Sequence, residues 1–224
     1  MKRVLGAMAI TGAVLAGMSG CFVGDDGERR DVGYAVAEPV RVLVVQGRTG
    51  GVVVRGGGGS EVRVTEHQSY RGEAPRSSHV LKDGTLTLTY DCEDCGLGYE
   101  VDVPAGTAVR VTAQTGGVRL SGLAGEVEAT VSTGGVEATG LTSRTVLLRS
   151  GTGGIEASFA AAPAKVEART GTGGVRLRVP AGDAYAVDAS AGTGEVDVAV
   201  PQQPGAPRGI LARAETGGVT VGHG

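Results

Sequence analysis

The residues best suited to chemistry in this sequence are two thiols in the segment Asp91–Cys95, where Cys92 and Cys95 lie among three carboxylates. In an exported chain this spacing predicts a disulfide between them. A metal site and a pair of free thiols are the alternatives, although no second Cys-x-x-Cys pair and no nearby histidine completes a ligand set. A thioredoxin-like redox role would need a βαβ context, and none is visible.

Combinations of acid, base and nucleophile are scarce in the rest of the chain. His67, His79 and His223 have a spacing that suggests neither metal ligation nor a catalytic triad. Glu137 and Glu156 occupy equivalent positions of the repeat described below, and stacking alone would place them about 4.8 Å apart. That separation is therefore no evidence for a glycosidase-type pair. We expect no catalytic residue, no metal and no cofactor.

The start of the chain has the order of a bacterial export signal. Basic residues precede an apolar run over Val4–Met18, which is followed by Ser19, Gly20 and Cys21. The run is too short to cross a bilayer, which takes about 20 apolar residues, so we predict a signal peptide over residues 1–20. The end of the run resembles the lipobox of bacterial lipoproteins, with Met18 in place of the usual Leu.

The lipobox resemblance implies that Cys21 is acylated by fatty acids such as palmitate, and simple secretion is the alternative. Residues 21–39 are rich in charge and glycine, which predicts a flexible tether between the lipid and the folded domain. The expected localisation is the extracytoplasmic face of the bacterial cell membrane.

The overall composition predicts a single all-β domain. Gly supplies 41 of 224 residues, Trp is absent and Pro is only 8, and no three-residue glycine period supports a collagen. The formal net charge of −3, with 20% charged residues, argues against a nucleic-acid-binding protein.

A Thr-Gly-Gly-Val motif recurs along the chain. From Thr115 onward, its threonines advance by 18, 19, 20, 21 and 23 residues, a period typical of solenoids. Apolar and charged positions alternate on both sides of each motif, which predicts two short strands per repeat and a glycine corner between them. The corner glycines are Gly50, Gly51, Gly116, Gly117, Gly134, Gly135, Gly153, Gly154, Gly173, Gly174, Gly194, Gly217 and Gly218.

This pattern predicts a single-stranded parallel β-helix over residues 40–224, with about 20 residues per coil and right-handed coiling. Residues 107–224 form the regular coils. Residues 40–106 keep strand character without the period, include a hairpin turn at Asp83-Gly84 and are expected to be irregular capping coils.

Stacking of successive coils also predicts ladders of equivalent side chains. Val118, Val136, Ile155 and Val175 should form one buried column. In the outer charge ladder Arg119 should meet Glu137, while Glu156 should meet Arg176 and then Asp197. We interpret this row of mixed sign as a solvated face that fixes register.

The Thr-Gly-Gly-Val repeats, the Val-Pro-Ala-Gly phrases at Val103–Gly106 and Val179–Gly182, and the lipoprotein-like leader resemble the bacterial putative-adhesin family of unknown function with β-strand repeats. The similarity covers Val40 to Gly224. It implies a parallel β-helix on the cell envelope with adhesion as the proposed role, and it assigns no catalytic residues.

The expected function is therefore a non-enzymatic cell-surface lipoprotein that presents a β-solenoid for envelope interaction or adhesion. Its expected partners are the membrane, through a lipid anchor, and an envelope protein or polysaccharide, without nucleic acid. End-to-end self-association stays open. The alternatives are a polysaccharide-active β-helix enzyme and a scaffold or regulatory lipoprotein of envelope stress.

Overall fold

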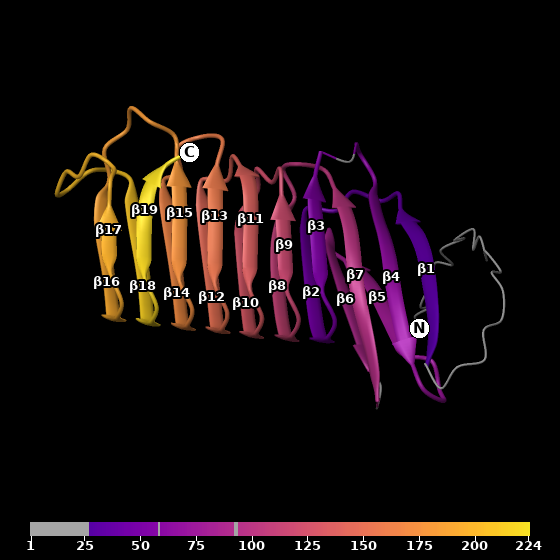
Figure 1. Cartoon of the computed structure of the whole chain (residues 1–224). Helices are drawn as coiled ribbons and strands as arrows, with labels where there is room; N and C mark the ends of the chain where they lie inside the picture. The colour runs from indigo at the N-terminus through magenta and orange to yellow at the C-terminus, as the bar shows by residue number, and fades with distance from the viewer. Residues whose placement is uncertain (1–26, 58, 92–93) are drawn as a thin grey trace, which may run out of the picture.

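The structure is a computed structural model that describes residues 27–57, 59–91 and 94–224. Within these residues every regular element is a β-strand, and the strands form two layers that face each other across an apolar interior (Figure 1). The predicted all-β class is confirmed.

The two sheets run the length of the molecule and contain ten and nine strands. Sheet A contains, in spatial order, β1 (Glu28–Val36), β4 (Val62–Tyr70), β7 (Cys95–Val103), β3 (Val52–Gly56), β9 (Val118–Ser121), β11 (Val136–Leu141), β13 (Ile155–Phe159), β15 (Val175–Val179), β19 (Val219–His223) and β17 (Val196–Val198). Sheet B contains β16 (Ala186–Thr193), β18 (Gly209–Thr216), β14 (Lys165–Thr172), β12 (Thr145–Thr152), β10 (Val127–Thr133), β8 (Ala108–Thr115), β2 (Val42–Thr49), β6 (Thr85–Asp91) and β5 (Arg76–Lys82).

The alternation of residue types explains why these segments form strands with one buried face. In β8, Val109 and Val111 are buried whereas Arg110 and Thr112 are exposed. Successive side chains of a strand point to opposite faces, so each short strand adds apolar residues to the interior and polar residues to the surface. Burial of each valine contributes about 1.5–3 kcal/mol.

Parallel, in-register pairing in the middle of sheet A builds the predicted apolar column. Val118 pairs with Val136, Val136 with Ile155, and Ile155 with Val175. All four are at most 2% exposed. The column is confirmed, and it lies between the two sheets.

Each Thr-Gly-Gly corner carries the chain from a strand of sheet B into a strand of sheet A. At Gly116 the backbone has a φ of 138°, and a Cβ there would lie 2.2 Å from the carbonyl oxygen of Gly50. The Gly116 amide donates a hydrogen bond to the carbonyl of Thr133 at 2.9 Å, so neighbouring corners touch through backbone. Positive φ is shared by the first glycine of the other corners, Gly50, Gly134, Gly153, Gly173, Gly194 and Gly217, and by none of the second glycines.

Coils β8–β9, β10–β11, β12–β13 and β14–β15 stack in chain order, but the next two exchange places. β18 lies between β14 and β16, and β19 lies between β15 and β17. The sequence predicts Asp197 next to Arg176; this is wrong, because Arg176 pairs with Thr220 and Thr220 pairs with Asp197.

A difference in burial accompanies the exchange of the two coils. The inner strands β18 and β19 bury most of their inward side chains, whereas β16 and β17 are largely exposed or half-buried. Val196 on β17 is 44% exposed. This difference follows from position, because the β18–β19 coil has a neighbour on each side and the β16–β17 coil has only one.

Antiparallel strands form the other end of both sheets. β4 pairs with β7 and with β1, and β5 pairs with β6 across a turn in which Asp83 and Gly84 both have positive φ. The hairpin prediction at Asp83-Gly84 is confirmed. The sheets are mixed because of these strands, so the finer expectation of a single-stranded, right-handed parallel β-helix stays a prediction.

One part of the expected tether is a strand, which corrects the prediction for residues 28–36. β1 pairs antiparallel with β4 along its whole length, and Val32, Tyr34 and Val36 point toward the interior. The charged residues of this segment lie on its exposed positions. Their abundance hid the alternation of apolar residues that makes the segment a strand.

Three predicted features lie outside the described residues: the signal peptide over residues 1–20, Cys21 and Cys92. Cys95 begins β7 and is half-buried. In the portion of the chain that the structure covers, no helix has the length and apolar character needed to span a membrane.

Candidate functional site: charged rows and a capping network

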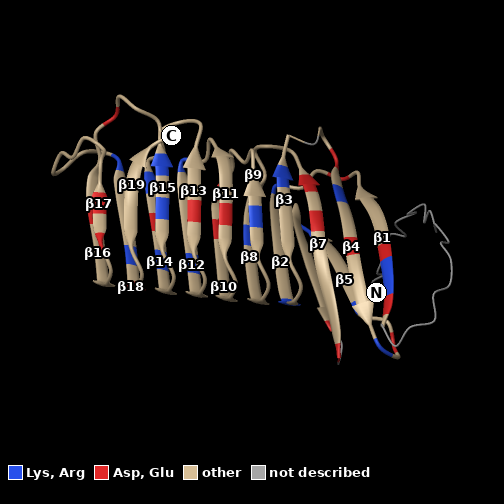
Figure 2. Cartoon of the chain, in the orientation of Figure 1, with Lys and Arg blue, Asp and Glu red and all other residues tan. Residues whose placement is uncertain are grey.

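The outer face of sheet A carries a row of mixed charge, in which Glu137 and Glu156 are neighbours. Arg119 of β9 forms an ion pair with Glu137 of β11 at 3.4 Å, and Glu156 of β13 forms one with Arg176 of β15. Figure 2 shows the sign changing along the strands of this face. These side chains are about half to two-thirds exposed, so each pair contributes about 0–1 kcal/mol and the row has little net charge.

The outer face of sheet B carries a row of like charge. Arg149, Arg169 and Arg213 stand three residues before the corner threonines of β12, β14 and β18, and register pairs them on successive strands. Strand spacing places their Cα atoms about 4.8 Å apart. Three guanidinium groups thus form a line across the strands, which we call the arginine row.

Two carboxylates neutralise part of the arginine row. Glu167 accepts a hydrogen bond from Arg149 at 3.0 Å and lies 2.9 Å from Arg169, while Arg213 donates to Asp188 at 2.7 Å. The hydrogen bond from Arg149 and the positive charges around it hold the pKa of Glu167 below its ordinary value. One carboxylate is therefore shared by two guanidinium groups.

A shallow hollow of about 780 Å³ lies beside the arginine row. All three arginines line it, together with Glu215 on β18. Its lining also includes glycines and hydroxyl-bearing residues, namely Gly151, Gly171, Gly192, Thr130, Ser132, Ser150, Thr170 and Ser190. The Ser150 and Thr170 hydroxyls already donate to the corner carbonyls of Gly134 and Gly153, at 2.9 and 2.8 Å.

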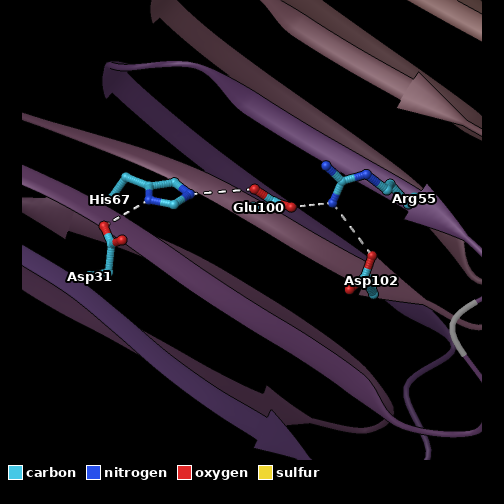
Figure 3. A network of polar contacts seen from close by, with 5 residues as sticks. All are labelled: Asp31, Arg55, His67, Glu100 and Asp102. Atoms are coloured by element: carbon cyan, nitrogen blue, oxygen red, sulfur yellow. Dashed lines mark hydrogen bonds and ion pairs between the residues drawn. The ribbon is translucent and has the colours of Figure 1, made fainter. Parts of the chain in front are cut away.

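A second polar cluster crosses the outer face of the capping strands (Figure 3). His67 of β4 lies between Asp31 of β1, with Nδ1 2.8 Å from Oδ1, and Glu100 of β7, with Nε2 3.5 Å from Oε2. Glu100 also pairs with Arg55 of β3, whose guanidinium lies 3.8 Å from Asp102. We call these five residues the capping network, and it links four adjacent strands.

The electrostatics of the capping network follow from its alternating charges. The hydrogen bond with Asp31, aided by Glu100, raises the pKa of His67 above its ordinary value. The hydrogen bond from Arg55, aided by His67, lowers the pKa of Glu100. All five side chains are between 37% and 71% exposed, so the network joins strands at the surface rather than enclosing a reacting group.

A buried carboxylate lies on the inner side of the capping strands. Glu66 is 1% exposed and accepts hydrogen bonds from the Tyr34 hydroxyl at 3.1 Å and the Gln68 amide at 3.0 Å. Burial, reinforced by Glu66, raises the pKa of Tyr34 well above its usual range. Both donors are neutral, so Glu66 has the polar partners that a buried oxygen requires.

A hollow of about 1100 Å³ also lies at the capping end. Arg29, Arg48, Tyr70 and Tyr90 are among its lining residues. Arg48 forms an ion pair with Asp91 at 3.1 Å. Within the described residues, no group of three or more His, Cys, Asp or Glu side chains could hold a metal ion.

The sequence-based candidates are distributed over different parts of the molecule. His67 belongs to the capping network, His79 stacks on Tyr34 with ring centroids 4.5 Å apart, and His223 ends β19 on the surface. The capping network, Glu66 and the arginine row were not predicted from the sequence. Comparison of the third residue before each corner threonine would have found Arg149, Arg169 and Arg213, although not their adjacency.

Comparison with known proteins shows similarity at the level of the fold. No protein-family model matches the chain, and no curated protein matches its sequence. A solved structure of a putative cell adhesion protein from Clostridium sporogenes is 12% identical, with a TM-score of 0.55 over 88% of this chain and 100% of that one. A putative adhesin from Bacteroides fragilis is 14% identical, with a TM-score of 0.51 over 89% of this chain and 100% of that one.

Proposed function

We propose that this chain is a non-enzymatic, cell-surface β-solenoid that presents its long outer faces for adhesion or envelope interaction. The observation that carries the proposal is the in-register stacking of short strands, which repeats surface side chains along two extended faces. The fold likeness to two proteins named for adhesion supports the same role.

The chemistry of the surface also supports display over catalysis. The mixed-sign row of sheet A and the capping network consist of exposed ion pairs between opposite charges. Such arrangements hold strands in register and leave no single activated group. The described polar side chains thus favour a binding surface.

A binding assay tests the adhesion half of this proposal. The purified full-length chain is incubated with cell-wall sacculi and with immobilised extracellular matrix, beside an unrelated exported lipoprotein of similar size as the control. We expect saturable binding to at least one of these materials by this chain and none by the control. Binding no stronger than that of the control would contradict the adhesive role.

We propose further that the protein is exported through residues 1–20 and anchored by lipid on Cys21. The basic-apolar-small order of the leader and its lipobox resemblance support this address. Acylation with more than one fatty-acyl group would give stable anchoring, since each methylene group buried in the bilayer contributes about 0.8 kcal/mol to membrane binding. A Cys21→Ala protein should move from the membrane fraction to the soluble fraction. Its retention in membranes would contradict lipidation at Cys21.

A further inference from the structure

We propose that the arginine row binds a linear acidic polysaccharide that lies across β12, β14 and β18. This inference rests on the proposed surface role and deepens it by naming the class of ligand. The row consists of Arg149, Arg169 and Arg213, which register aligns on three adjacent strands.

The alignment of three arginines introduces repulsion between like charges in the free protein, and Glu167 and Asp188 offset part of it. Like charges directly opposite each other on adjacent strands repel, and here three arginines follow one another without interruption. On sheet A the same stacking pairs Arg119 with Glu137 and Glu156 with Arg176, and only one like-charge pair, Glu137 with Glu156, lies between them. A bound polyanion would relieve the repulsion on sheet B.

The two carboxylates beside the row leave its charge incompletely neutralised. Glu167 is shared by Arg149 and Arg169, and Asp188 serves Arg213. The three guanidinium side chains are 45–48% exposed, so their outer N–H groups face the hollow and solvent. A guanidinium can donate two parallel hydrogen bonds to a carboxylate or a phosphate, which gives both strength and orientation.

The geometry of the hollow suits an extended chain of anionic groups. Arg149 and Arg213 are separated by two strand spacings, so their Cα atoms lie about 10 Å apart. A polymer whose anionic groups repeat at one or two times the distance between adjacent strands therefore matches the row. Gly151 and Gly171 leave the floor beside Arg149 and Arg169 free of side chains, whereas Glu215 occupies the equivalent position on β18. Thr130, Ser132 and Ser190 offer hydroxyl groups at the margins, as sugar recognition requires.

The lining favours a polysaccharide over a nucleic acid. Single-stranded nucleic acids bind proteins through aromatic side chains on which bases stack, and no aromatic residue lines this hollow. The net charge of −3 also differs from the basic character of duplex-binding domains. Glu215 also lines the hollow and opposes any anion, which limits affinity and supplies a variant that should strengthen binding.

The test measures binding of the full-length chain to immobilised polymers by biolayer interferometry. Polygalacturonate provides carboxylates, dextran phosphate provides phosphates, dextran is the neutral control and poly(dT) is the nucleic-acid probe. The variants are Arg169→Gln, the triple change of all three arginines to Gln, and Glu215→Gln. Arg178→Gln is the matched control, because Arg178 is exposed on the outer face of sheet A and its loss changes the net charge equally.

We expect salt-sensitive binding to at least one anionic polysaccharide, and the tighter of the two identifies carboxylate or phosphate as the recognised group. Arg169→Gln should weaken this binding about fivefold, the effect of one exposed charged contact, and the triple variant should abolish it. Glu215→Gln should strengthen it about twofold, and Arg178→Gln should change it less than twofold. Thermal unfolding of each variant verifies that it is folded.

Three results would overturn the inference: no binding to either anionic polysaccharide, equal weakening by Arg178→Gln and Arg169→Gln, or binding to poly(dT) as tight as to the polysaccharide. The sacculus assay separates this failure from failure of the proposed function. If the triple variant binds sacculi as well as the unchanged chain does, the arginine row is not the ligand site while the adhesive role stands. If the unchanged chain binds neither material, both proposals fail.

Discussion

Replacement of Gly116 by alanine is expected to destabilise the protein far more than replacement of its neighbour Gly117. Gly116 has a φ of 138°, and its Cβ would approach the carbonyl oxygen of Gly50 to 2.2 Å and the carbonyl carbon to 2.6 Å. These are backbone atoms of the adjacent corner, so no side chain can rotate away to relieve the collision. Gly117 has no positive φ, and a Cβ there would lie 3.8 Å from the carbonyl oxygen of Gly135, an ordinary contact.

The magnitude follows from two costs. A residue with a Cβ in this region of φ costs about 1–3 kcal/mol. Displacement of the neighbouring corner costs a similar amount, about 1–3 kcal/mol. A net loss of about 3 kcal/mol in the free energy of unfolding would lower Tm by about 6–12 °C in a domain of this size. Gly117→Ala should stay within about 1 kcal/mol of the unchanged protein, because alanine lowers the entropy of the unfolded chain.

Thermal and urea unfolding followed by circular dichroism measure this difference. Both variants add the same methyl group to the same corner, so composition and purification effects are matched. A Gly116→Ala protein with a Tm equal to that of Gly117→Ala would refute the steric account of the corners. It would mean that adjacent coils can separate at the corner without loss of stability.

Three further predictions concern other parts of the molecule. The pKa of His67 is raised in the folded protein, so protonated His67 stabilises the capping strands fully below pH values of about 6.5, its ordinary pKa, and this contribution is lost as pH rises through the raised pKa. Tm should therefore fall as pH rises through this range, and it should fall less in the His67→Gln variant. Plots of Tm against pH that run parallel for the two proteins would contradict the role of His67. A chain shortened to end at Arg208 lacks β18 and β19. Amide hydrogen exchange should then become faster in β14 and β16, which pair with β18, but not in β8. Unchanged protection of the β14 amides would argue against the position of β18 between β14 and β16. If Cys92 and Cys95 form a disulfide, alkylation before reduction should add no mass at either residue, and labelling of both without reductant would exclude the bond.

The sequence predicted the central part of the fold because that part depends on local, repeating constraints. Alternation of apolar and polar residues around each corner required two strands with one buried face, and the column Val118–Val136–Ile155–Val175 followed from equal spacing. The Arg119–Glu137 and Glu156–Arg176 ion pairs followed from the same register. These features need only that neighbouring repeats stack. Stacking of neighbours in the chain buries the apolar face of each repeat with the smallest loss of chain entropy.

The ends of the molecule were less predictable because pairing there joins segments of unequal type. β1 was hidden among charged residues, and its partner β4 begins more than 25 residues later in the chain, at Val62. The capping network combines side chains from β1, β3, β4 and β7, so no single spacing in the sequence reveals it. Antiparallel partners of this kind are selected by the complete set of contacts at the edge.

The sequence by itself determined the strands of the regular coils, the glycine corners and the buried face of each of those strands, since these depend on side-chain period and backbone sterics within about 20 residues. Only the tertiary structure decided which coil lies beside which. Chain order would place Ser190 next to Arg169, but the insertion of β18 places Arg213 there. The arginine row therefore exists because β18 lies between β14 and β16, an arrangement that the packing of the whole stack sets and that no local pattern in the sequence indicates.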